Sequence, residues 1–108
     1  MPRAVLLTAG AERDLASIYD HLAQATSERA AEHLLDRLLH LGDGLRDMPE
    51  RGNHPPELLA LGIREFRQLT LKPYRLIYRM LDDDVIIVLI ADGRRDMQTL
   101  LAQRLLGG

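Results

Sequence analysis

Residues 74–90 read YRLIYRMLDDDVIIVLI, and they contain the clearest secondary-structure pattern in the chain. In an extended strand successive side chains point to opposite faces, so residues 74–81 would place two tyrosines, a leucine and a methionine on one face. Arg75 and Arg79 would lie on the other face. The three aspartates at 82–84 predict a hairpin turn, and residues 85–90 are apolar on both faces, as is typical of a central strand. This stretch therefore predicts an antiparallel strand pair whose second strand lies inside a sheet.

Two further strands are expected around this pair. Residues 63–71 alternate with the same period of two and connect to residue 74 through a Lys72-Pro73 turn. Because both connections are short, the last three strands must run antiparallel. Residues 4–7 predict a short first strand near the N-terminus.

Helical periodicity accounts for most of the remaining sequence. Thr8 can cap a helix that runs to about residue 25, where apolar residues recur at intervals of three and four. A second helix, beginning at residue 26 or 27, carries a seam of leucines and stops at the Pro49 and Gly52 breakers. Residues 49–62 are rich in proline and glycine and are expected to be irregular. Residues 97–106 predict a short last helix.

These elements give the order β-α-α-β-β-β-α, an α+β fold in a single domain spanning residues 1–108. The helical hairpin must bury its leucine seam on one face of a mainly antiparallel four-stranded sheet. The opposite face of the sheet is expected to stay partly open, with Arg75 and Arg79 pointing from it.

The composition is that of an ordinary globular domain. The 108 residues are 46% hydrophobic and 28% charged, and they include no cysteine. The absence of cysteine excludes disulfides and thiolate metal sites and agrees with a reducing cytoplasm. The N-terminus lacks the apolar run of a signal peptide, and the longest apolar run, residues 85–91, is far shorter than the ~20 residues of a membrane span. We therefore expect a cytoplasmic protein.

The charged residues are unevenly distributed along the chain. Residues 1–61 hold six basic and ten acidic side chains, whereas residues 62–108 hold eight basic and six acidic ones. Three of those six acids are the turn aspartates, so the remaining surface of the second half is rich in arginine. Such a surface suits nucleic acid or an acidic protein segment, although an ordinary solvated surface has the same composition.

Arginines are the main candidates for a binding site. The set comprises Arg64, Arg67, Arg75, Arg79, Arg94 and Arg95. Arginine binds phosphate or carboxylate through two parallel hydrogen bonds, but it stays charged at neutral pH and cannot act as an acid or base. The four histidines lack the spacing of metal ligands, and there is no phosphate-binding loop or nucleophile elbow. No metal ion, cofactor or catalytic residue is therefore expected.

The sequence resembles the RelE/ParE superfamily of type II toxin–antitoxin toxins across nearly its whole length. The matching segments are Leu7-Thr8, Ala11, Asp14-Leu15, Met48-Pro49, Gly52, Gly62-Ile63-Arg64, residues 73–79, Asp82-Asp83, residues 92–96, Leu100-Leu101 and Arg104-Leu105. No single segment is specific, and the resemblance depends on their order and spacing along the same pattern of elements. It implies a RelE-like fold, a toxin function and a cognate antitoxin as partner.

The superfamily divides by target. RelE-like members are ribosome-dependent ribonucleases that use basic strand residues, two arginines and a tyrosine near the C-terminus. In this chain the two arginines match Arg75 and Arg95, while the other positions fall on Gln68, Thr70 and Leu101. The groups for proton transfer and base stacking are thus replaced, which favours the ParE branch, whose members resemble RelE in fold and poison DNA gyrase.

We therefore expect a ParE-like toxin that inhibits DNA gyrase by binding and is held inactive in a complex with its antitoxin. The expected target-binding residues are Arg75, Arg79, Arg94, Arg95 and Arg104, with Arg104 pointing outward from the last helix. Two alternatives stay open. One is a RelE-like messenger endoribonuclease that acts on the ribosome with Arg75, Arg95 and an unrecognised base, and the other is a homologue that has lost toxicity and persists as a binding module.

Overall fold

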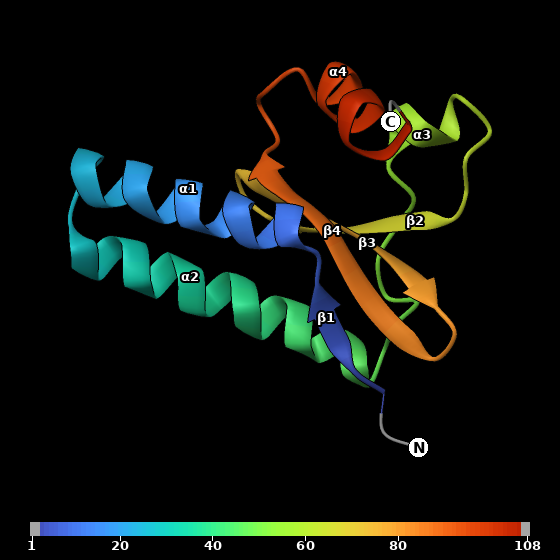
Figure 1. Cartoon of the computed structure of the whole chain (residues 1–108), viewed down its shortest axis with the longest axis horizontal. Coiled ribbons are helices and arrows are strands. Elements are labelled where there is room, and N and C mark those ends of the chain that lie inside the picture. Colours follow the sequence, from blue (N-terminus) through green and yellow to red (C-terminus); the bar gives the residue numbers. More distant parts are fainter. Residues whose placement is uncertain (1–2, 107–108) are drawn as a thin grey trace.

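A computed structural model describes residues 3–106 and confirms the expected α+β architecture (Figure 1). The elements are β1 (Val5–Leu7), α1 (Ala9–Ala25), α2 (Glu28–Asp43), η1 (Gly44–Arg46), α3 (Pro56–Leu59), β2 (Phe66–Leu71), β3 (Tyr74–Leu81), β4 (Asp84–Asp92), α4 (Met97–Leu101) and η2 (Ala102–Leu106). They form a four-stranded sheet with the order β1-β4-β3-β2. Within residues 3–106 no helix is long and apolar enough to cross a membrane.

The sheet is antiparallel except at one edge. β1 runs parallel to β4, and β2, β3 and β4 are joined antiparallel by tight turns. β4, which is apolar from Val85 to Ala91, lies inside the sheet, as its sequence predicts, because it has a partner on either side. Arg75 at the start of β3 lies opposite Ala91, whereas Arg79 lies opposite Ile86, so the two arginines point from opposite ends of the β3–β4 pair.

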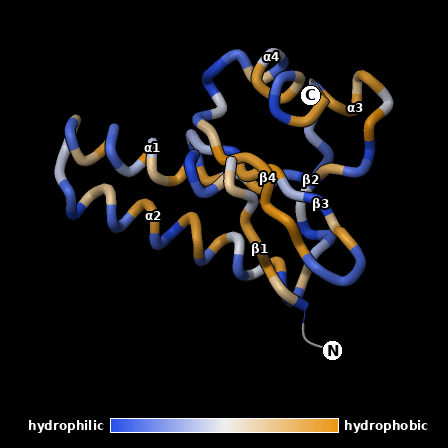
Figure 2. Tube along the Cα trace, in the orientation of Figure 1, coloured by the Kyte–Doolittle hydropathy of each residue, from blue (hydrophilic) through white to orange (hydrophobic). Residues whose placement is uncertain are grey.

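The helical hairpin covers one face of the sheet. Thr8 caps the N-terminus of α1 and Ser27 caps that of α2. The hydroxyl of each accepts a hydrogen bond from the backbone N–H three residues later. Leu15 of α1 and Leu38 of α2 pack against Leu76 and other side chains on this face. In Figure 2 the β4 trace is largely hydrophobic, while α2 alternates between hydrophobic and hydrophilic residues along its length, as expected for a helix with one buried face.

The opposite face of the sheet is also covered. The expectation that this face stays partly open is therefore wrong. α3 and α4 lie over it (Figure 1) and close a second hydrophobic core. That core contains Leu58, Phe66, Ile77, Leu89, Ala91, Met97 and Leu101. Residues 49–62 are therefore not wholly irregular, since they include the short helix α3. Sequence periodicity does not reveal this helix, because four residues are too few to establish a helical period.

The strand expected at residues 63–71 begins three residues later, at Phe66. Ile63 is used to end α3 instead, because its N–H donates to Leu58 O at 3.0 Å while Gly62 adopts a φ of 77°. The last helix also differs from the expected residues 97–106. It is α-helical only to Leu101 and continues as a π-helical turn.

The loop before α3 covers the outer edge of β2. Asn53 exchanges two backbone hydrogen bonds with Gln68, and His54 Nδ1 lies 3.0 Å from Phe66 O. The buried hydroxyl of Tyr78 accepts from Gly52 N at 3.0 Å and donates to Pro49 O at 2.7 Å. This tyrosine therefore holds the loop from inside the core.

Candidate functional site

The guanidinium of Arg75 is engaged almost completely within the protein. Its Nη1 and Nη2 donate to the two carboxylate oxygens of Glu57, each at 2.8 Å, and its Nε donates to Gln68 Oε1 at 2.8 Å. The Arg75 side chain is 13% exposed and that of Glu57 is 24% exposed. The hydrogen bonds from Arg75 hold the pKa of the Glu57 carboxyl below its usual value. A dissolved anion would therefore meet a neutralised pair at this point rather than a free cation.

Gly93 brings the end of β4 against the stem of Arg75. Gly93 N donates to Pro73 O at 2.7 Å, and a Cβ at this position would lie only 2.7 Å from Arg75 Cδ. Glycine is thus required for the close approach. Arg94 and Arg95 follow directly, so the structure brings them to the same end of the β3–β4 pair as Arg75.

Arg94 and Arg95 are the accessible members of this group. Arg94 is 78% exposed and pairs with Asp92, with Nη2 at 2.6 Å from Oδ2 and Nε at 3.0 Å from Oδ1. The hydrogen bonds from the side chain and backbone of Arg94 lower the pKa of Asp92 from 3.8 to about 2. Arg95 is exposed and takes part in none of the ion pairs found between residues 3 and 106.

Arg79 stands apart from the other arginines. Its Nη2 lies 3.2 Å from Glu65 Oε2, and its guanidinium lies over the ring of Phe66 at 5.6 Å from the centroid. Its Nε is buried and has no hydrogen-bond partner among the described residues. Because Arg79 lies at the far end of β3, it does not join Arg75, Arg94 and Arg95 in one site.

Arg104 does not point outward, and that expectation is wrong. Its two terminal nitrogens donate to Asp14 Oδ1 and Oδ2 at 2.9 and 3.0 Å, and Nη2 also reaches Val88 O at 3.2 Å. The side chains of Arg104 and Asp14 are 28% and 17% exposed. Asp14 Oδ2 accepts a further bond from Ile90 N at 3.0 Å. The pair therefore ties the end of the chain to α1 and to the part of β4 that extends beyond β1.

A polar cavity lies between α1 and the end of β4. It has a volume of about 280 Å³ and is lined by Asp14, Ser17, Ile18, His21, Tyr74, Ile90, Ala91, Asp92 and Arg95. Both of its carboxylates are paired with arginines, Asp14 with Arg104 and Asp92 with Arg94. The cation of Arg95 is therefore the charge that this cavity offers to a partner.

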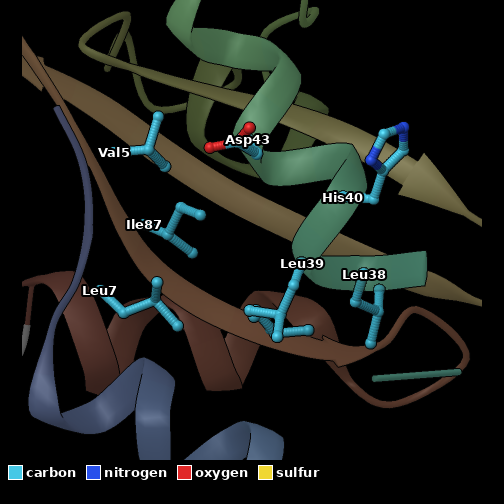
Figure 3. Close-up of a pocket in the computed structure, with 8 residues that line it drawn as sticks. Val5, Leu7, Leu38, Leu39, His40, Asp43 and Ile87 are labelled. Atoms are coloured by element: carbon cyan, nitrogen blue, oxygen red, sulfur yellow. The ribbon is translucent and has the colours of Figure 1, made fainter. Parts of the chain in front are cut away.

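A second cavity, between β1 and α2, is mostly apolar (Figure 3). Its volume is about 380 Å³, and it is lined by Val5, Leu7, Leu38, Leu39, His40, Asp43, Ile87 and Ile90. The figure shows aliphatic side chains of β1, β4 and α2 gathered in the cavity, while the His40 ring points away from them. Leu39 is exposed at the border of this cavity, so this region carries apolar surface that contact with a partner would bury.

Three of the positions that match functional residues of RelE carry residues of another type in this chain. Gln68 is buried and bonded to Arg75, Leu101 is buried in the second core, and Thr70 is an exposed residue opposite Arg75. Among the described residues no group of three or more histidine, aspartate or glutamate side chains could hold a metal ion.

Sequence reasoning missed two residues that organise this region, Glu57 and Asp14. Glu57 belongs to the segment expected to be irregular, and only its position on α3 brings it to Arg75. Asp14 fits the ordinary pattern of acids that favour the start of a helix. Its contacts with Ile90 and Arg104 span 76 and 90 residues, and nothing in the local sequence indicates them.

Comparison with known proteins gives consistent relatives. Residues 5–97 match the family described as the ParE toxin of type II toxin–antitoxin system, parDE. Toxin ParE3 of Caulobacter vibrioides is 26% identical over 100 residues, which are 93% of this chain and 96% of the relative. The chromosomal ParDE system from P. aeruginosa superposes with a TM-score of 0.70 at 22% identity and covers 83% of this chain and 95% of the other. A mutant of the E. coli toxin RelE in the free state superposes with a TM-score of 0.58 at 15% identity and covers 98% of this chain and 100% of the other.

Proposed function

Because the chain belongs to the ParE toxin family of type II toxin–antitoxin systems, we propose that it inhibits DNA gyrase by binding the enzyme, without cleaving RNA. The observation that supports this proposal is the state of Arg75. The charge of the arginine that would hold an RNA phosphate in a RelE-like nuclease is neutralised by Glu57, and its Nε donates to Gln68. Leu101, which occupies the position of the RelE tyrosine, is buried in the second core. Binding by charge and shape needs no group that transfers a proton, whereas cleavage does.

The proposed gyrase-binding surface is the segment that begins at Arg94. Arg94 and Arg95 are exposed at the end of a rigid sheet, and the contacts of Arg104 fix the chain that follows them. Fixed presentation of exposed charges favours recognition of a protein partner, because little conformational freedom is lost on binding.

A supercoiling assay with purified gyrase tests this proposal. The wild-type protein should inhibit supercoiling or trap cleaved DNA, and the Arg94→Ala/Arg95→Ala variant should lose most of that effect. The matched control is Arg13→Ala/Arg29→Ala, which removes the same charge from exposed positions on α1 and α2. Loss of inhibition in both variants would indicate only a general charge effect.

Primer extension on translating ribosomes tests the ribonuclease alternative directly. The wild-type protein should leave messenger RNA intact. Codon-specific cuts that disappear in the Arg95→Ala variant would overturn the proposal and favour a RelE-like nuclease.

We also propose that a cognate antitoxin neutralises the protein by placing an apolar segment in the cavity between β1 and α2. The apolar lining of the cavity and the exposed Leu39 at its border support this, and two of the solved relatives are a ParDE system and the RelBE2 complex of Mycobacterium tuberculosis. Leu39→Arg should weaken co-purification with the product of the adjacent gene. Leu59→Arg is the control, because Leu59 is similarly exposed, 38% against 43%, but lies on α3. Equal effects of the two changes would count against this location.

A further inference from the structure

Arg75 has the geometry of an oxyanion site that is already filled. Its stem packs against Gly93, and Gln68 Oε1 accepts from its Nε. These contacts orient the edge formed by Nη1 and Nη2, which donates two parallel hydrogen bonds to Glu57. Planar, bidentate donation of this kind is how arginine holds either a carboxylate or a phosphate.

Glu57 reaches this edge from an anchored position. It lies on α3 between Pro55 and Leu58, both of which are buried. Leu58 belongs to the second hydrophobic core, so moving α3 away would expose apolar surface. The carboxylate is therefore held close to Arg75 by the packing of its neighbours as well as by its own charge.

We propose that Glu57 is an internal anion that excludes the phosphodiesters of a nucleic-acid strand from Arg75 and thereby determines the specificity of this end of the sheet. A strand with repeated phosphates would contact Arg75 together with the exposed Arg94 and Arg95, which lie directly beyond Gly93. To do so it must first break the pair between Arg75 and Glu57. Its apparent affinity is therefore the intrinsic affinity multiplied by the small fraction of molecules in which that pair is open. This inference does not depend on gyrase being the target.

Fluorescence anisotropy with a labelled single-stranded oligouridine of about 12 nucleotides tests the inference. Glu57→Gln removes the charge while keeping the size of the side chain, and it should bind the RNA about tenfold more tightly than the wild type. The salt dependence should steepen by about one phosphate contact. In Glu57→Gln/Arg75→Ala the gain should disappear. Asp43→Asn is the matched control, because it removes the same negative charge and releases Arg46 from an ion pair elsewhere.

Each outcome of this comparison decides the proposal. A gain that is specific to Glu57→Gln and is abolished by Arg75→Ala supports it. The proposal is wrong if Glu57→Gln binds like the wild type, if Asp43→Asn gains as much, or if the gain persists without Arg75. Circular dichroism establishes that each variant is folded, and Glu57→Ala replaces Glu57→Gln in the same comparison if the latter does not fold. Inhibition of gyrase by the wild type is measured separately, so the two proposals can fail independently.

Discussion

Replacing Asp14 by alanine should lower the free energy of unfolding by about 2–4 kcal/mol. The larger part comes from Ile90, whose buried backbone N–H loses a carboxylate acceptor at 3.0 Å. A hydrogen bond to a charged group contributes about 1.5–3 kcal/mol. The ion pair with Arg104 adds about 0–1 kcal/mol, because both side chains retain contact with solvent. A typical domain is stable by only about 5–15 kcal/mol, so the loss is readily measurable.

Two companion variants separate the contributions. Asp14→Asn keeps an acceptor for Ile90 and removes the charge, so it should cost about 1 kcal/mol. Asp20→Ala is the matched control, since Asp20 is exposed on the same helix and takes part in none of the ion pairs of residues 3–106. Any gain in helix propensity from alanine is common to both sites and cancels in the comparison.

Urea denaturation followed by circular dichroism measures these differences. With a slope of about 2 kcal/mol per molar, the midpoint for Asp14→Ala should fall by roughly 1–2 M relative to Asp20→Ala. Equal midpoints for the two alanine variants would refute the reasoning. The carboxylate at position 14 would then contribute nothing to the edge of β4 beyond what any exposed acid on α1 contributes.

Three further changes have definite expected outcomes. Gly52→Ala should destabilise the fold by about 1–3 kcal/mol in a thermal melt, because its Cβ would lie 2.5 Å from Gln68 O and 2.7 Å from Tyr78 Oη. Tyr78→Phe should cost about 1–3 kcal/mol by the same measurement, because it leaves the backbone N–H of Gly52 without its partner. Asp92 has a pKa lowered from 3.8 to about 2, so its pairing with Arg94 stabilises the protein above about pH 4 and is lost as the pH falls toward 2. The stability difference between wild type and Asp92→Asn should therefore shrink over that interval, and a constant difference would contradict the assignment.

The sequence predicts those parts of the fold that repeat a local pattern. The alternation at residues 74–81 and the apolar run that follows establish the hairpin and its central strand. Thr8 caps α1 as expected, and Ser27, one of the two expected starting positions, caps α2. Helix α3, and the covering of the second sheet face by α3 and α4, could not be predicted from a local pattern. α3 has only four residues, and it is stabilised by the contact of Leu58 with side chains from distant strands.

The candidate site was predictable in residue type but not in geometry. The spacing of arginines along β3 and after β4 indicates where positive charge gathers, and Arg94 and Arg95 are indeed exposed. The states of Arg75 and Arg104 depend on carboxylates far away in the sequence. Glu57 precedes Arg75 by 18 residues and Asp14 precedes Arg104 by 90. Periodicity carries no information about such pairs, because they form only when separate elements pack together.

The loop that covers the edge of β2 has a consequence for self-association. Unpaired strand edges are templates on which further chains add, and this is a common route to aggregation. Asn53 and His54 occupy the outward-facing backbone groups of Gln68 and Phe66, so another copy cannot pair there while the loop is in place. The rate at which concentrated protein polymerises through β2 should therefore follow the opening of residues 49–54. That opening requires less energy than global unfolding, because it leaves the helical hairpin intact.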